Sequence, residues 1–167
     1  MEYSTLPKTR RDAVLTLKDG TGSPVTLEIE YEEGNVTFDT PKEAQTVIRD
    51  RGVITTIRKG DSEPAATGSF SAFFRQFTDG AEAGSMLDFI NKTGHYASNV
   101  STGLSGTPFV EFYCIDLAYR IDASSVDAAE TAHQATLSKC VCTASFTEGD
   151  PSSFTINFTC YGGVSYT

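Results

Sequence analysis

Apolar and polar residues alternate along two segments near the N-terminus, residues 13–17 and 25–31. The residues between them, 19–24, are Asp, Gly, Thr, Ser and Pro, most of which favour turns. Alternation with a period of two is typical of a strand with one buried and one solvent-exposed face. The pattern therefore predicts a hairpin in which Val25, Leu27, Ile29 and Tyr31 point into the core. Thr26, Glu28, Glu30 and Glu32 are predicted to form an outward row.

A second hairpin is predicted at the C-terminus, from residues 134–147 and 154–161 around a polar turn at 148–153. Symmetric pairing about Asp150 places Cys140 opposite Cys160 and Cys142 opposite Phe158. The same register sets Ala144 opposite Ile156 and Phe146 opposite Phe154. All of these side chains share one face, and a coherent apolar face supports the register.

Three further strands and one helix are expected between the hairpins. The strands span residues 52–59, 67–77 and 109–122. The second carries aromatic residues on both faces, and the third begins with both faces apolar. Such strands lie centrally in a sheet or line a subunit contact. Ser85 is a good N-cap and Asp88 completes a capping box, so a short helix is predicted to run from there until Gly94.

Two stretches break the pattern. Residues 33–50 contain a short strand at 35–38, then Pro41, then a segment at 42–48 that we expect to be a helical turn or a mobile arm. Residues 94–108 are rich in Gly, Ser, Thr and Asn. We expect one domain over residues 1–167, with 33–50 and 94–108 as extended arms or loops.

Composition narrows the class of protein. The chain has 167 residues, with 22 Asp and Glu against 13 Lys and Arg, so its net charge is −9. A protein that binds nucleic acid tightly needs a basic face. The acidic composition therefore argues against nucleic-acid binding as the main role. No apolar run approaches the roughly 20 residues that cross a bilayer. The first residues do not resemble a secretory signal, so we expect synthesis in the cytoplasm and no membrane contact.

Abundant Val, Ile, Thr, Phe and Tyr favour strands. We therefore expect a mainly β fold, an antiparallel β-sandwich or half-barrel with one short flanking α-helix.

Candidate chemistry is sparse. The chain has two His and four Cys and contains none of the phosphate-loop, dinucleotide, zinc-protease or nucleophile-elbow motifs. We expect no enzymatic activity, no cofactor and no metal, since Cys140 and Cys142 lack zinc-site spacing. His95 and His133 are expected to be exposed. Buried thiols are the favoured interpretation of the cysteines, and Cys140 with Cys160 is the candidate disulfide.

The organisation resembles that of phage tail tube proteins. The resemblance is carried by residues 52–64 leading into 69–74, by the helix at 86–91 and by the hairpin at 142–161 with its turn at 148–152. It covers roughly residues 50–92 and 109–162. It implies a small antiparallel β-sandwich or half-barrel, six copies of which close into a ring with one continuous barrel around a channel. The rings stack into the tube through which DNA leaves the capsid.

The resemblance also implies partners and location. The subunit would assemble with itself, with a tail sheath if the tail contracts, and with tape measure, baseplate and head–tail completion proteins. It would be made in the bacterial cytoplasm and end in the virion. An acidic channel repels phosphates, so DNA would pass without being held. The excess of acidic residues after Thr93 marks candidates for the channel lining.

Two alternatives remain open. One is a tube protein of a contractile injection or secretion system, which shares the fold. The other is a secreted, disulfide-bonded β-sandwich binding module, favoured by the observation that all four Asn, Asn35, Asn91, Asn99 and Asn157, lie in N-x-[ST] triplets.

Overall fold

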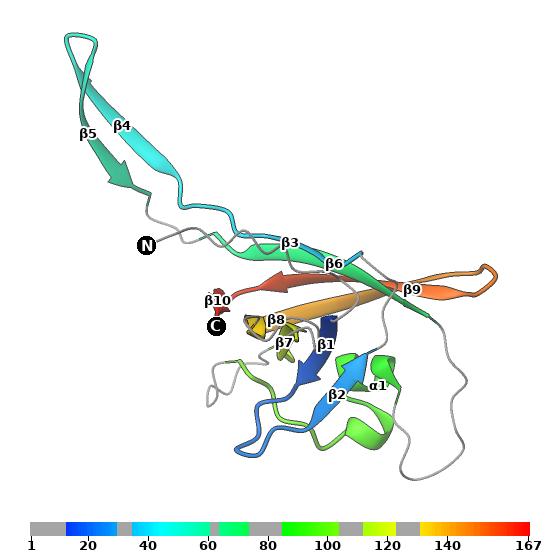
Figure 1. The fold of residues 1–167 in the computed structure, drawn as a ribbon. Helices are drawn as coiled ribbons and strands as arrows, with labels where there is room; N and C mark the ends of the chain where they lie inside the picture. Colours follow the sequence, from blue (N-terminus) through cyan, green and yellow to red (C-terminus); the bar gives the residue numbers. More distant parts are fainter. Residues whose placement is uncertain (1–12, 30–34, 61–63, 74–84, 104–111, 123–130) are drawn as a thin grey trace.

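The computed structural model describes residues 13–29, 35–60, 64–73, 85–103, 112–122 and 131–167. These residues form ten strands, one α-helix and one 3-10 helix (Figure 1). The mainly β, antiparallel fold with one short α-helix is confirmed. The elements are β1 (Ala13–Lys18), β2 (Thr26–Ile29), β3 (Thr37–Asp39), β4 (Gln45–Asp50), β5 (Val53–Lys59), β6 (Ala66–Phe73), α1 (Met86–Asn91), η2 (Gly94–Tyr96), β7 (Ile115–Ile121), β8 (His133–Thr147), β9 (Ser153–Cys160) and β10 (Val164–Tyr166).

Eight strands form one antiparallel sheet in the order β2-β1-β7-β8-β9-β6-β3, with β10 pairing to β8. The two edge strands, β2 and β3, have only four and three residues. The sheet does not close on itself into a barrel within the described part of the chain, and β4 and β5 form a separate two-stranded sheet.

The N-terminal hairpin is confirmed. Leu15 pairs with Ile29 and Leu17 pairs with Leu27 across β1 and β2. Leu15 and Leu17 are buried, whereas Glu28 is exposed, as the alternation predicts. The inward position predicted for Val25 is wrong: it precedes β2, its backbone bonds to Asp19 in the turn, and its side chain is 39% exposed. Tyr31 lies outside the described residues.

The C-terminal hairpin has the predicted register throughout, from Cys140 opposite Cys160 to Phe146 opposite Phe154. The sequence pattern did not reveal a β-bulge in the middle of β8, between Leu137 and Cys140, where the pairing with β7 shifts between Ile115 and Leu117. Lys139 adopts a φ of 56° there, and its N–H donates to Asp116 Oδ1 at 2.9 Å. The extra residue changes the parity of β8, so Leu137 and Cys140 both reach the core.

Helix α1 begins as predicted, with both hydrogen bonds of the capping box between Ser85 and Asp88 present. It ends at Lys92, whose left-handed conformation caps it, and not at Gly94. The helix lies against β2 and β8 and buries Phe89, whose ring meets that of Tyr96 at 4.9 Å. The core is therefore enclosed between the sheet and α1.

Of the two structures expected for residues 42–48, a helical turn or an arm, the helical turn is wrong. Residues 45–50 form β4, which pairs with β5. The β-branched run Thr46, Val47 and Ile48 favours a strand once β5 supplies a partner. Strand β5, which matches the strand expected over residues 52–59, is the second half of this hairpin, and Figure 1 shows the hairpin pointing away from the main sheet.

Residues 94–103 form a loop, as expected, but the loop packs on the body and is not a free arm. The N–H of Gly20 donates to the carbonyl of Val100 at 2.8 Å, and the N–H of Thr102 donates to the carbonyl of Cys114 at 2.8 Å. Tyr96 and Asn99 are buried. Residues 104–108, and the predicted extensions of strands over 74–77 and 109–111, lie outside the described residues.

Candidate assembly surfaces

The hairpin of β4 and β5, here called the arm, is exposed along its entire length. Every residue of both strands is solvent-exposed, including five large apolar side chains. These are Val47, Ile48, Val53, Ile54 and Ile57. An isolated two-stranded hairpin is marginally stable in water, because it has no further strand or helix against which to bury its apolar face. The arm thus has the properties of an element that is completed by a partner.

The apolar side chains of the arm are divided between its two faces. Directly opposed residues of an antiparallel pair share a face, so Val47 and Ile57 lie together, and Arg49 lies beside Ile54. A bulge between Ile48 and Arg49 separates these two pairs and twists the ribbon. Val47, Ile54 and Ile57 therefore share one face with Arg49, whereas Ile48 and Val53 lie on the opposite face, so the arm exposes apolar surface on both sides.

The charge of the arm is opposite to that of the whole chain. Arg49, Arg51, Arg58 and Lys59 stand against Asp50 between residues 45 and 59, a net charge of +3, whereas the chain as a whole carries −9. Lys59 is paired with Glu43 at 3.3 Å, next to the base of the arm. A basic projection on an acidic body is electrostatically complementary to the body of another copy.

A second exposed surface lies on the main sheet, on the side of β6, β8 and β9 that faces away from the core. We call it the hydroxyl face. Its outward residues are Thr67, Ser69, Ser71 and Phe73 on β6, Val141, Thr143, Ser145 and Thr147 on β8, and Ser153, Thr155, Asn157 and Thr159 on β9. None of them is charged, although acidic residues are common elsewhere in the chain.

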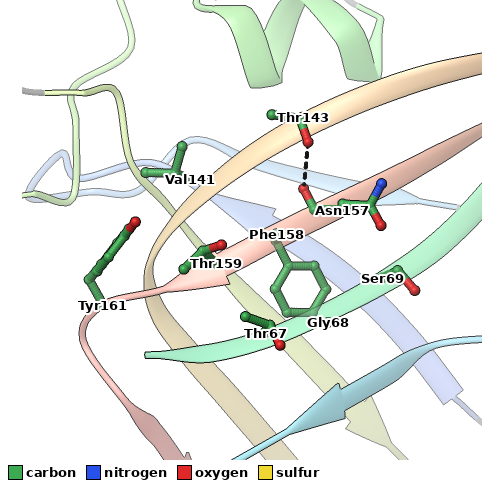
Figure 2. A pocket seen from close by; sticks show the side chains of 9 residues that line it. All are labelled: Thr67, Gly68, Ser69, Val141, Thr143, Asn157, Phe158, Thr159 and Tyr161. Atoms are coloured by element: carbon green, nitrogen blue, oxygen red, sulfur yellow. Dashed lines mark hydrogen bonds between the residues drawn. The ribbon is translucent and has the colours of Figure 1, made fainter. Parts of the chain in front are cut away.

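A shallow groove of about 450 Å³ runs along the hydroxyl face (Figure 2). Figure 2 shows the Thr143 hydroxyl donating to the Asn157 carbonyl, at 3.4 Å, and Tyr161 at one end of the groove. Gly68 fits tightly there, since a Cβ would lie 2.3 Å from the Phe158 ring and from the Thr37 carbonyl. Glycine is required at this position for β3, β6 and Phe158 to pack together.

Apolar residues are also exposed in the segments that were predicted as strands with apolar residues on both faces. Phe112, just before β7, is 76% exposed, and Phe73, at the end of β6, is 39% exposed. The described part of the chain does not cover Phe112, although its segment was expected to have both faces covered. Phe146, at the far end of β8, packs on Phe154 with ring centres 5.4 Å apart yet remains 56% exposed.

The four cysteines lie close together in the sheet. Cys114, Cys140 and Cys160 are buried and Cys142 is half-buried, all as free thiols. Burial raises the pKa of the Cys142 thiol to about 12. A hydrogen bond to Cys160, together with burial, raises the pKa of Cys140. Among the described residues, no group of three or more His, Cys, Asp and Glu is placed to hold a metal ion. The disulfide stays a prediction.

Other candidate residues are dispersed. His95 is exposed in η2, and His133 is exposed but begins β8 and does not lie in a connector. Asn99, one of the four triplet asparagines, is only 3% exposed and its amide donates to the Tyr113 hydroxyl at 3.3 Å. That amide is not available to a glycan in the folded chain. None of the helices in the described residues is long and apolar enough to cross a membrane.

Comparisons with known proteins identify the fold. No protein-family model matches the chain, and no curated protein matches it. Among solved structures, a chain in the cryo-electron microscopy structure of the anti-feeding prophage (AFP) baseplate, 6-fold symmetrised, has a similar fold. The match covers 100% of this chain and 97% of that chain, with a TM-score of 0.50 and 8% identity. The protein therefore shares, along its whole length, the fold of a chain found in a prophage baseplate.

Proposed function

We propose that the protein is a structural, non-enzymatic subunit of a phage-tail-like particle, and that it assembles into stacked hexameric rings forming a tail tube that conducts DNA. The observation that carries the proposal is the arm. A fully exposed, apolar and basic hairpin on an acidic body is incomplete as a monomer and fits a second copy of the same chain.

Two features of the main sheet support ring formation. Pairing of the short edges β2 and β3 with strands of neighbouring copies would extend the sheet around a ring and remove its open edges. The hydroxyl face supplies a surface without cations, and a channel that conducts DNA must not hold its phosphates. The structural likeness to a chain of a 6-fold symmetrised baseplate is consistent with six-membered rings.

The second candidate is a tube or baseplate subunit of an injection-type particle without a genome. The likeness to a prophage baseplate chain favours it. The two candidates share the ring and the role of the arm, and they differ in cargo. Particles isolated from producing cells distinguish them, because only a DNA-conducting tail is attached to a DNA-filled capsid.

Negative-stain microscopy of the purified chain tests the proposal. We expect rings or tubes of uniform diameter. The double variant Val47→Thr, Ile57→Thr keeps β-branched side chains on the arm but removes its apolar pair, and should raise the protein concentration needed for assembly at least about tenfold, the equivalent of roughly 1.4 kcal/mol.

The matched control is Val25→Thr, the same substitution at a similarly exposed position on the body. It should assemble like the unmodified chain. A wild-type protein that stays a monodisperse monomer at high concentration would refute the proposal, as would equal assembly of the double variant and the control.

A further inference from the structure

Cys140 and Cys160 occupy a special position in the sheet. They are directly opposed on β8 and β9, and both side chains are directed into the core, with 0% and 1% of their surface exposed. The next pair towards the bulge is Lys139 and Tyr161, where the Tyr161 N–H donates to the Lys139 carbonyl at 3.2 Å.

Hydrogen-bonded and non-hydrogen-bonded pairs alternate along an antiparallel ladder. Because Lys139 and Tyr161 are hydrogen-bonded, Cys140 and Cys160 form a non-hydrogen-bonded pair. At such positions the Cα atoms are about 4.5 Å apart and the side chains approach most closely. That separation lies within the range of about 4.4–6.8 Å found between the Cα atoms of disulfides.

The bulge positions the two thiols further. The Cys160 thiol donates to the Ser138 carbonyl at 2.9 Å and to the Gly163 carbonyl at 3.2 Å. The Cys140 thiol donates to the Leu137 carbonyl at 3.4 Å. Both sulfurs are thus held beside the same turn of backbone, between the bulge of β8 and the end of β9.

We infer that Cys140 and Cys160 form an intramolecular cross-link site that closes when the protein meets an oxidising small-molecule disulfide, independently of the proposed function. The thiolate of one cysteine attacks the reagent RSSR, forms a mixed disulfide and releases RS⁻. The thiolate of the other then attacks the protein sulfur and releases the second RS⁻. Two protein thiols are oxidised, the reagent disulfide is reduced, and the two thiol protons end on two RSH molecules.

The bond would fasten the end of β9 to the bulge of β8. It would close a loop of about 20 residues and stabilise the fold by restricting the unfolded chain. The competing pairing is Cys114 with Cys142, which interact electrostatically. In the ladder, however, Cys114 is offset by one residue from the position opposite Cys142, because Ile115 pairs with Cys140. Residues that are one position apart along a strand have side chains on opposite faces of the sheet.

The test incubates the full chain with glutathione disulfide, both in the folded state and during refolding from urea. We expect a mass loss of about 2 Da and a single linkage between the peptides carrying Cys140 and Cys160. Oxidation should be slow in the folded state, because the pair is buried. The oxidised protein should melt roughly 5–10 °C above the reduced protein.

Two variants keep the inference falsifiable. The double variant Cys114→Ser, Cys142→Ser should retain the bond and the melting shift, whereas Cys160→Ala should lose both. Four free thiols after refolding with glutathione disulfide would overturn the inference, as would a bond between Cys114 and Cys142. None of these experiments measures ring assembly, so their outcome is separate from that of the tail-tube proposal.

Discussion

At the scale of single residues, Asp19 links two parts of the chain that lie far apart in sequence. Its carboxylate is 3% exposed and accepts hydrogen bonds from the N–H groups of Val25, at 2.7 Å, and Val100, at 3.1 Å, and from the Thr21 hydroxyl. Burial by itself would raise the pKa of Asp19, but these hydrogen bonds to the ionised form outweigh it and lower the pKa. The ionised carboxylate therefore ties the first hairpin to the loop at 94–103.

A depressed pKa has a definite consequence for acid stability. The folded protein favours the ionised form of Asp19 more strongly than the unfolded chain does. The stabilisation that Asp19 gives the fold is therefore present above the unfolded pKa of about 3.9, and it is lost as the pH falls through the lower pKa of the folded state. Asp19→Asn cannot accept both sets of hydrogen bonds and should reduce the free energy of unfolding by about 1–3 kcal/mol at pH 7.

Urea unfolding at pH 7 and at about pH 3 measures this effect. The difference between wild type and Asp19→Asn should shrink at the lower pH, while Asp50→Asn, on the exposed arm, should change stability little at either pH. A difference that is independent of pH would contradict the role given to the ionised carboxylate.

At the scale of elements, helix α1 is short and depends on its ends. The Ser85 hydroxyl accepts from the Asp88 N–H at 3.1 Å and donates to the Asp88 carboxylate at 2.8 Å. A six-residue helix gains little from its own backbone hydrogen bonds, so its N-cap and the buried Phe89 keep it on the sheet.

Removal of the cap is expected to loosen the helix. Ser85→Ala should lower the free energy of unfolding by about 1 kcal/mol, and Ser85→Thr, which keeps the hydroxyl, should lower it by clearly less. Chemical denaturation of the two variants side by side checks this. Equal stability of the Ala and Thr variants would show that the cap contributes nothing.

At the scale of the whole molecule, the separation of charge between arm and body has a measurable consequence for assembly. Attraction between exposed charges is screened beyond about 10 Å at 0.1 M salt and beyond about 3 Å at 1 M. Assembly of the wild-type chain should therefore be fastest at low ionic strength. The double variant Arg51→Gln, Arg58→Gln should assemble more slowly there, by several-fold, and should depend less on salt.

Light scattering during assembly, at about 0.05 M and 0.5 M salt, compares the variant with wild type. Lys18→Gln, which removes a basic side chain from β1 on the body, is the control and should keep the wild-type salt dependence. If the arm variant keeps the wild-type rate and salt dependence, the basic side chains of the arm do not contribute to assembly. The contribution of its apolar side chains is tested separately by Val47→Thr, Ile57→Thr.

The sequence by itself determined the local units of this protein. Alternation fixed both hairpins, and symmetric pairing about Asp150 predicted the complete register of β8 and β9, because a slip of one residue would turn every apolar side chain outward. The capping box of Ser85 and Asp88 could also be predicted from the sequence, since it depends on two residues only three positions apart.

Only the tertiary structure decided what those units do together. The bulge at Lys139, the burial of Asn99 and the packing of the loop at 94–103 each depend on contacts between residues distant in sequence. The arm shows the same limit most clearly. Its strands were predicted as a broken segment followed by a separate strand, because periodicity reports which residues are apolar and not which element they pack against. In the described part of the chain, these two strands pair only with each other and are exposed throughout.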